Sequence, residues 1–127
     1  MEYKDLTVLV ADDFLPMRQI IKGILRKLGF INILDVSNGA EAWGCICSNR
    51  IDLIISDLNM PEVSGLVLLK RVRGQERTMH IPFLMITAEA YERPVVEAIE
   101  AKVSSYIVKP FGADTLMRKI EQLLPQH

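Results

Sequence analysis

Short apolar runs alternate with helical segments along the whole chain, and this alternation is the strongest constraint on the fold. The third run is continuous and rich in β-branched residues, a pattern typical of strands that are buried on both faces. We expect strands over residues 6–11, 33–36, 53–56, 83–86 and 106–108.

Between these runs, apolar residues recur at spacings of three and four, which predicts amphipathic helices. Pro16 suits the first turn of the first helix and Gly29 its end, while Ser64 can cap the third helix before Gly74 closes it. The expected apolar stripes are Met17, Ile20, Ile21, Ile24, Leu25 and Leu28; Ala42, Trp43, Ile46 and Cys47; Leu66, Leu69 and Val72; Val95, Val96, Ile99 and Val103; and Leu116, Met117, Ile120, Leu123 and Leu124.

Five strand–helix units in succession predict the α/β class, with a doubly wound parallel sheet of five strands and helices on both faces. We expect the flavodoxin-like strand order 2-1-3-4-5. The length fits one domain over residues 1–127, and no repeat, low-complexity tract or linker divides it.

The charge pattern gives no reason to expect nucleic acid or an anionic membrane as a partner. The formal net charge is −1 and the basic residues are scattered. No apolar stretch approaches the roughly 20 residues that span a bilayer, and the N-terminus lacks a signal-peptide core. Cys45 and Cys47 do not have the spacing of redox or zinc sites. We therefore expect a cytoplasmic monomer.

Polar side chains follow four of the expected strands, at the point where each strand ends. Asp12 and Asp13 follow the first strand, Asp57 the third, Thr87 the fourth and Lys109 the fifth. Each alone is usually a helix cap, a turn residue or a solvated side chain. Because those strands are neighbours in the expected order, the residues should meet at one edge of the sheet.

These residue types suit phosphoryl transfer. Three neighbouring carboxylates repel one another, and Mg²⁺ relieves the repulsion because it prefers oxygen ligands. The ion can also neutralise phosphoryl oxygens, while a lysine and a hydroxyl bind the remaining ones. An aspartate can act as the nucleophile and form an acyl phosphate.

At these residues the chain resembles the response-regulator receiver family, and within it the stand-alone regulators of chemotaxis. The resemblance covers nearly the whole chain. It rests on four segments in matching order and spacing, at residues 10–14, 56–61, 86–90 and 106–111.

The resemblance implies that Asp57 is the phosphoacceptor. It also implies that Asp13, Asp57 and the backbone carbonyl of Asn59 bind Mg²⁺ directly, with Asp12 reaching the ion through water.

Further roles are implied for residues around the phosphoryl group. Thr87 would bond it and move toward it, Lys109 would pair with it, and Tyr106 would turn inward as a switch. Asn59 and Glu89 would tune the lifetime of the phosphorylated state.

Two further predictions concern the backbone before Pro110 and at the end of the fourth helix. The resemblance implies a cis peptide bond before Pro110. Lys102-Val103 departs from the Gly-Ala more common in the family, which could alter the end of the fourth helix and the output face.

The resemblance also implies the partners. A histidine kinase would donate the phosphoryl group, the flagellar motor switch protein would be the target, and a phosphatase could reverse the signal. The protein would be a switch that catalyses only its own phosphorylation and dephosphorylation. A receiver in another phosphorelay, or one cut from a larger regulator, remains the alternative.

Two other classes fit the residues less well. Haloacid-dehalogenase-type phosphatases carry a second aspartate two places after the nucleophile, and here that residue is Asn59, whose amide cannot exchange a catalytic proton. A flavin carrier needs a phosphate cradle after the first strand, where Asp12 and Asp13 would repel a phosphate.

Overall fold

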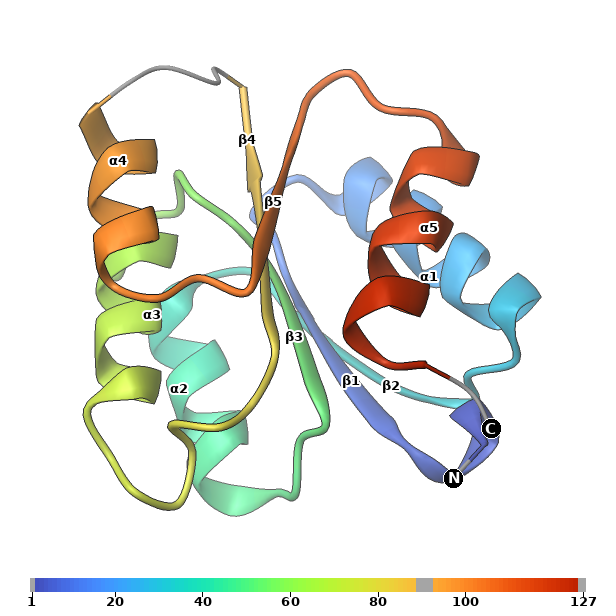
Figure 1. The fold of residues 1–127 in the computed structure, drawn as a ribbon, viewed down its shortest axis with the longest axis horizontal. Helices are drawn as coiled ribbons and strands as arrows, with labels where there is room; N and C mark the ends of the chain where they lie inside the picture. Colours follow the sequence, from blue (N-terminus) through green and yellow to red (C-terminus); the bar gives the residue numbers. More distant parts are fainter. Residues whose placement is uncertain (1, 89–92, 126–127) are drawn as a thin grey trace.

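The computed structural model describes residues 2–88 and 93–125 of the chain. Its core is one parallel sheet of five strands in the order β2-β1-β3-β4-β5, which confirms the expected class and topology (Figure 1). The strands are β1 (Thr7–Ala11), β2 (Asn32–Val36), β3 (Leu53–Asp57), β4 (Phe83–Thr87) and β5 (Ser105–Val108).

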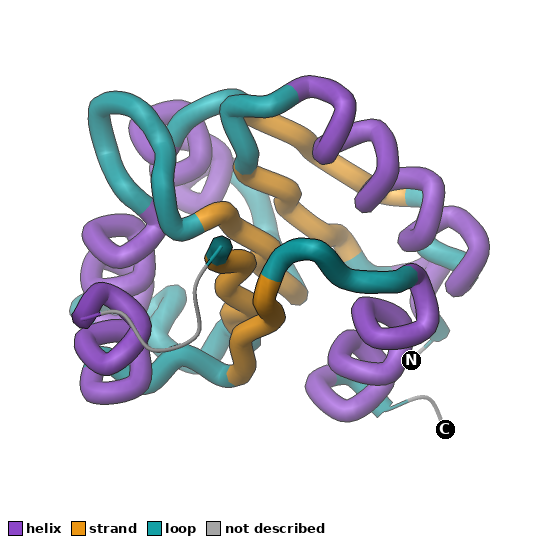
Figure 2. The backbone as a smooth tube through the Cα atoms, turned by 90° about the horizontal axis from the view of Figure 1, so that it is seen from above, coloured by secondary structure: helices purple, strands orange, loops and turns teal. Residues whose placement is uncertain are grey.

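Helices cover both faces of the sheet. One face carries α1 (Leu15–Leu28) and α5 (Ala113–Leu123), and the other carries α2 (Gly39–Ser48), α3 (Gly65–Arg73) and α4 (Arg93–Glu100) (Figures 1 and 2). A single 3₁₀ turn, η1 (Tyr3–Asp5), precedes β1. In the described part of the chain, no helix combines the length and apolar character that crossing a membrane requires.

Each face of the sheet packs into its own apolar core. Leu9 and Ile54 point toward α2, α3 and α4, whereas Val8 and Ile55 point toward α1 and α5. All residues of β3 and β4 are buried, as the continuous apolar runs predict for central strands. The centre of the sheet is therefore a rigid base for the loops that leave its carboxyl edge.

The expected helix signals act at both ends of the helices. The Ser64 hydroxyl accepts a hydrogen bond from the Val67 amide at 3.2 Å and caps α3. Gly29 ends α1 with a φ of 109°, a left-handed conformation that glycine adopts without strain.

In two helices, α1 and α2, the residues that face the core differ in part from the predicted stripes. Ile20 was expected on the apolar stripe of α1, but it faces solvent because Ile21 and Ile24 occupy the buried side. In α2, Cys45 packs against the core, whereas Cys47 is exposed. Ala42 and Ile46 form the buried side of α2. Cys45, three residues after Ala42, lies nearer to this side of the helix than Cys47, which is five residues after it.

The predicted stripe of α4 is also wrong in part. Val96 and Ile99 are 50% and 55% exposed, whereas Ala98 is buried. Val95, the other expected stripe residue within α4, lies outside the described side chains. Val103 lies beyond the helix, which ends at Glu100, although its side chain still packs against the core. Part of the apolar face of α4 is therefore uncovered.

Lys102 adopts a left-handed conformation with a φ of 66°, two residues after the end of α4. Glycine, which the resemblance to the receiver family suggests at this position, would adopt this conformation without the penalty of a Cβ atom. The Lys102 carbonyl nevertheless accepts a hydrogen bond from Arg73 Nε at 2.9 Å, and the Val103 amide donates to the Ala98 carbonyl at 3.0 Å. The departure from Gly-Ala therefore leaves a strained residue but an ordered helix end.

Replacing Lys102 with glycine should stabilise the protein by about 1 kcal/mol, because it removes the penalty of a side chain in the left-handed region. Urea denaturation measures the change in the free energy of unfolding. The control is Gln19→Gly at an exposed position in the middle of α1, which should lower stability by about 1 kcal/mol. A loss of stability in Lys102→Gly would contradict the assignment of strain.

Candidate functional site

The strand register brings the predicted polar residues to one edge of the sheet. β1 and β3 are aligned so that Asp12 comes directly beside Asp57, one position beyond their last paired residues. β4 and β5 are paired up to Thr87, and the Lys109 amide donates a hydrogen bond to the Thr87 carbonyl at 2.8 Å. The ends of β1, β3, β4 and β5 thus lie together at one edge of the sheet.

Three carboxylates meet at this edge. Asp12, Asp13 and Asp57 offer oxygen atoms that all lie within 4.8 Å of one another. Asp12 and Asp57 are 1% and 7% exposed, whereas Asp13 faces solvent. Two of the three negative charges are therefore largely removed from water, and the third lies at the rim.

Lys109 places a positively charged side chain beside these carboxylates. Its ammonium nitrogen lies 3.4 Å from Asp57 Oδ1 and 3.9 Å from Asp12 Oδ2. The peptide bond between Lys109 and Pro110 is cis, as the sequence resemblance implies. One ammonium group therefore faces two buried carboxylates.

The two buried carboxyl groups are unfavourable in their charged form. Burial raises the pKa of Asp57 above its ordinary value, the charge of Asp12 raises it further, and Lys109 opposes both effects. Burial also raises the pKa of Asp12, against the backbone hydrogen bond from Phe14 and the charge of Lys109.

The site has the character of a cation site. Asp12 Oδ2 is buried and accepts no hydrogen bond from any residue that the structure describes. A buried acceptor of this kind normally has a partner. A hard divalent cation with its bound waters supplies such a partner and reduces the repulsion, so these residues fit Mg²⁺.

The loop after β3 is closely packed against the site. The Gly65 amide donates to the Leu58 carbonyl at 2.9 Å, and a Cβ atom on Gly65 would lie 2.2 Å from the Asp57 carbonyl oxygen. Only glycine therefore allows α3 to begin so near β3. Asn59 is exposed in this loop, two residues after Asp57.

The remaining predicted residues lie in different surroundings. Thr87 is buried at the end of β4, and Tyr106 is half-buried in β5, where it packs against the core on the α2, α3 and α4 side. Glu89 lies outside the described residues.

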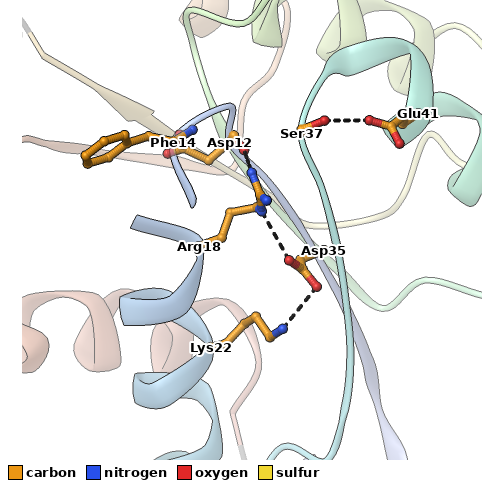
Figure 3. Close-up of polar contacts among 7 residues, drawn as sticks. All are labelled: Asp12, Phe14, Arg18, Lys22, Asp35, Ser37 and Glu41. Atoms are coloured by element: carbon orange, nitrogen blue, oxygen red, sulfur yellow. Dashed lines mark hydrogen bonds and ion pairs between the residues drawn. The ribbon is translucent and has the colours of Figure 1, made fainter. Parts of the chain in front are cut away.

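Sequence reasoning missed an ion-pair network behind the site (Figure 3). Arg18 donates one hydrogen bond to the Asp12 carbonyl and another to Asp35, and Lys22 donates to the same carboxylate. The spacing of Arg18 and Lys22 by four residues in α1 is a signal for a shared partner. That the partner is Asp35 of β2 depends on how α1 packs beside this strand.

Comparison with known proteins agrees with the fold. Residues 8–121 match the response regulator receiver domain. The chemotaxis protein CheY of Pseudomonas aeruginosa is 45% identical over 116 residues, which is 91% of this chain and 94% of that protein. CheY-3 of Vibrio cholerae is 42% identical over 120 residues, which is 94% of this chain and 92% of that protein.

Solved structures give the same result. The chemotaxis response regulator CheY4 of Vibrio cholerae has a TM-score of 0.87 and 32% identity, covering 94% of this chain and 98% of that chain. The receiver domain of a sensor histidine kinase from Pseudomonas aeruginosa, with a magnesium ion coordinated in its active-site cleft, has a TM-score of 0.86. Its identity is 25%, and the match covers 95% of this chain and 98% of that chain.

The fold and the acidic site define a two-component signalling domain of the receiver class. The chain belongs to the response regulator receiver family, and its chemotaxis relatives make it CheY-like.

Neutralising Asp57 should stabilise the metal-free protein at neutral pH. Since burial raises the pKa of Asp57 in the folded state, the unfolded chain loses this proton at lower pH, near 4. Folding stability should therefore fall as pH rises from about 4 through the folded pKa values of Asp12 and Asp57. Asp57→Asn should reduce this fall.

At neutral pH without Mg²⁺, Asp57→Asn should melt about 4 °C higher than wild type, equivalent to about 1 kcal/mol in a domain of this size. Thermal melts followed by circular dichroism measure this difference. The control is Asp114→Asn in the first turn of α5, an exposed carboxylate that does not belong to the acidic cluster, which should not raise the melting temperature. A lower melting temperature for Asp57→Asn would refute a strained acidic site.

Proposed function

We propose that this receiver, comprising residues 1–127, accepts a phosphoryl group on Asp57 from a histidine kinase with the help of Mg²⁺. The observation that carries this proposal is the Asp57 carboxylate, buried within 4.8 Å of the carboxylate oxygens of Asp12 and Asp13 and 3.4 Å from the Lys109 ammonium. A nucleophile, a cation site and a fixed positive charge are the parts that phosphoryl transfer needs.

In the reaction, a carboxylate oxygen of Asp57 attacks the phosphorus of the donor's phosphohistidine. A phosphorus–oxygen bond forms, the phosphorus–nitrogen bond breaks, and the histidine nitrogen leaves with the electron pair and takes up a proton. Asp13, Asp57 and the Asn59 carbonyl would hold Mg²⁺, with Asp12 acting through water. When bound, the ion neutralises charge on the phosphoryl oxygens.

The new charge would be bound by side chains already near Asp57. The Lys109 ammonium would pair with one phosphoryl oxygen, and the Thr87 hydroxyl would move to bind another. The displacement of Thr87 would let Tyr106 turn inward. Asn59 and Glu89 would tune the rate of hydrolysis from either side of the phosphoryl group.

The output surface we propose is the groove between α4, β5 and α5. It has a volume of about 640 Å³ and is lined by residues that include Ile99, Tyr106, Phe111 and Lys119. Ile99 is 55% exposed, so its apolar side chain is available to a partner. The chemotaxis relatives favour the flagellar motor switch protein as that partner. Phosphorylation would shift the population toward the state that binds it better, and its binding would favour that state in turn.

A second candidate is a receiver in another phosphorelay or in a larger regulator. The similarity to the receiver domain of a sensor histidine kinase favours it, because the same fold, with a magnesium ion in its active-site cleft, occurs there in a different kind of protein. The two candidates share the chemistry of Asp57 and differ in the target.

Phosphorylation of Asp57 is tested with a small acyl phosphate as donor. In the presence of Mg²⁺, intact-mass spectrometry should detect one added phosphoryl group on wild type, and removal of Mg²⁺ with a chelator should abolish it. Asp57→Asn should gain none, because an amide oxygen is a poor nucleophile. Asp114→Asn is the matched control and should be modified like wild type. Equal labelling of Asp57→Asn would refute the assignment.

Target binding is tested with a peptide from the flagellar motor switch protein, with Mg²⁺ and with or without beryllofluoride as a phosphoryl mimic. Beryllofluoride should tighten binding to wild type. Ile99→Ser should weaken it by about 10-fold, as truncation of a buried interface anchor does. Ile31→Ser, exposed before β2 at the opposite end of the sheet, should bind like wild type. Peptide binding that fails despite an occupied Asp57 site would favour the second candidate.

A further inference from the structure

Arg18 connects α1 to the acidic site through the backbone of Asp12 (Figure 3). Its Nη1 donates a hydrogen bond to the Asp12 carbonyl at 2.7 Å, and its Nε donates to Asp35 Oδ2 at 3.1 Å. Lys22 Nζ, one turn further along α1, donates to the other oxygen of Asp35 at 3.1 Å. The guanidinium group is therefore held between the site and a carboxylate of β2.

The anchor of this network is largely shielded from water. The side chains of Arg18 and Asp35 are 15% and 26% exposed. Burial alone would raise the pKa of Asp35, but the hydrogen bonds and charges of Lys22 and Arg18 outweigh it and hold the pKa below its ordinary value. Asp35 is therefore a stable anion that fixes the direction of the Arg18 fork.

The effect on the site follows from how Asp12 is held. Its amide donates to the Val36 carbonyl at 3.2 Å, its carbonyl accepts from Arg18, and its Oδ1 accepts from the Phe14 amide at 2.9 Å. These three bonds fix the backbone and one side-chain oxygen of Asp12. The remaining oxygen, Oδ2, is left near Lys109 and the other carboxylates.

We propose that Arg18, anchored by Asp35, is a positioning residue that holds Asp12 in the geometry that binds Mg²⁺ and so sets the affinity of the site for the ion. This inference rests on the proposed function of the acidic site. Hydrogen-bonded groups behind metal ligands commonly contribute 10- to 100-fold to metal affinity, about 1.4 to 2.7 kcal/mol.

A purely electrostatic role for Arg18 predicts the opposite effect. Arg18 adds a positive charge beside the site, and that charge repels a cation. If charge were its main contribution, removing Arg18 would tighten Mg²⁺ binding, and the change would shrink at high salt. If positioning dominates, removing it weakens Mg²⁺ binding at low and high salt alike.

The test is isothermal titration calorimetry of Mg²⁺ into wild type, Arg18→Met and Lys22→Met at two salt concentrations. Methionine keeps much of the length of either side chain and removes its charge and hydrogen bonds. We expect Arg18→Met to raise the Mg²⁺ dissociation constant by about 10-fold. Lys22→Met is the matched control, because Lys22 shares the Asp35 partner but makes no hydrogen bond to Asp12; its dissociation constant should stay near the wild-type value.

Melting temperatures without Mg²⁺ show that the variants are folded, and Arg18→Gln repeats the test if Arg18→Met is too unstable. If the folded Arg18 variant has the same Mg²⁺ dissociation constant as wild type, or a lower one, the proposal is overturned. An equal loss in Lys22→Met would also overturn it, because the effect would then belong to Asp35 and not to the bond with Asp12. Failure of wild type to bind Mg²⁺ would instead refute the proposed function.

Discussion

The repulsion between two buried carboxylates is the constraint on which the rest of the structure depends. Asp12 and Asp57 lie at the carboxyl ends of adjacent central strands, where burial disfavours their charges and Lys109 is the ammonium group that faces both. Such a site holds its shape only on a rigid base. β3 is buried along its whole length and supplies that base, because its apolar residues pack into both cores of the domain.

The site and the groove are linked through β5. Tyr106 lies within this strand and lines the groove, and Lys109 directly follows the strand and contacts Asp57. A change of charge at Asp57 acts on Lys109, and therefore on the strand that forms the floor of the groove. The exposed apolar face of α4 beside it provides surface that a second state can repack. In the proposed mechanism, this connection would link phosphorylation of Asp57 to the binding of a partner in the groove.

The opposite side of the site is held in a different way. Arg18 reaches the Asp12 carbonyl from α1, and Asp35 holds Arg18 from β2. This network fixes the first strand end by hydrogen bonds, whereas the output side contains residues that our proposed mechanism requires to move. In the proposed mechanism, the residues that hold the ion and the residues that move therefore belong to different helices and to different edges of the sheet.

The sequence by itself determined the α/β class, the strand order and the convergence of Asp12, Asp13, Asp57 and Lys109. The class follows from hydrophobic periodicity, which is local and repeats along the chain. The strand order was taken from the flavodoxin-like fold, and the convergence follows from that order and from the residue types at the strand ends. Only the tertiary structure decided that Cys45 rather than Cys47 packs against the core, and that Arg18 pairs with Asp35. These outcomes depend on the rotation of each helix against the sheet and on contacts between distant residues, and a local pattern does not specify either.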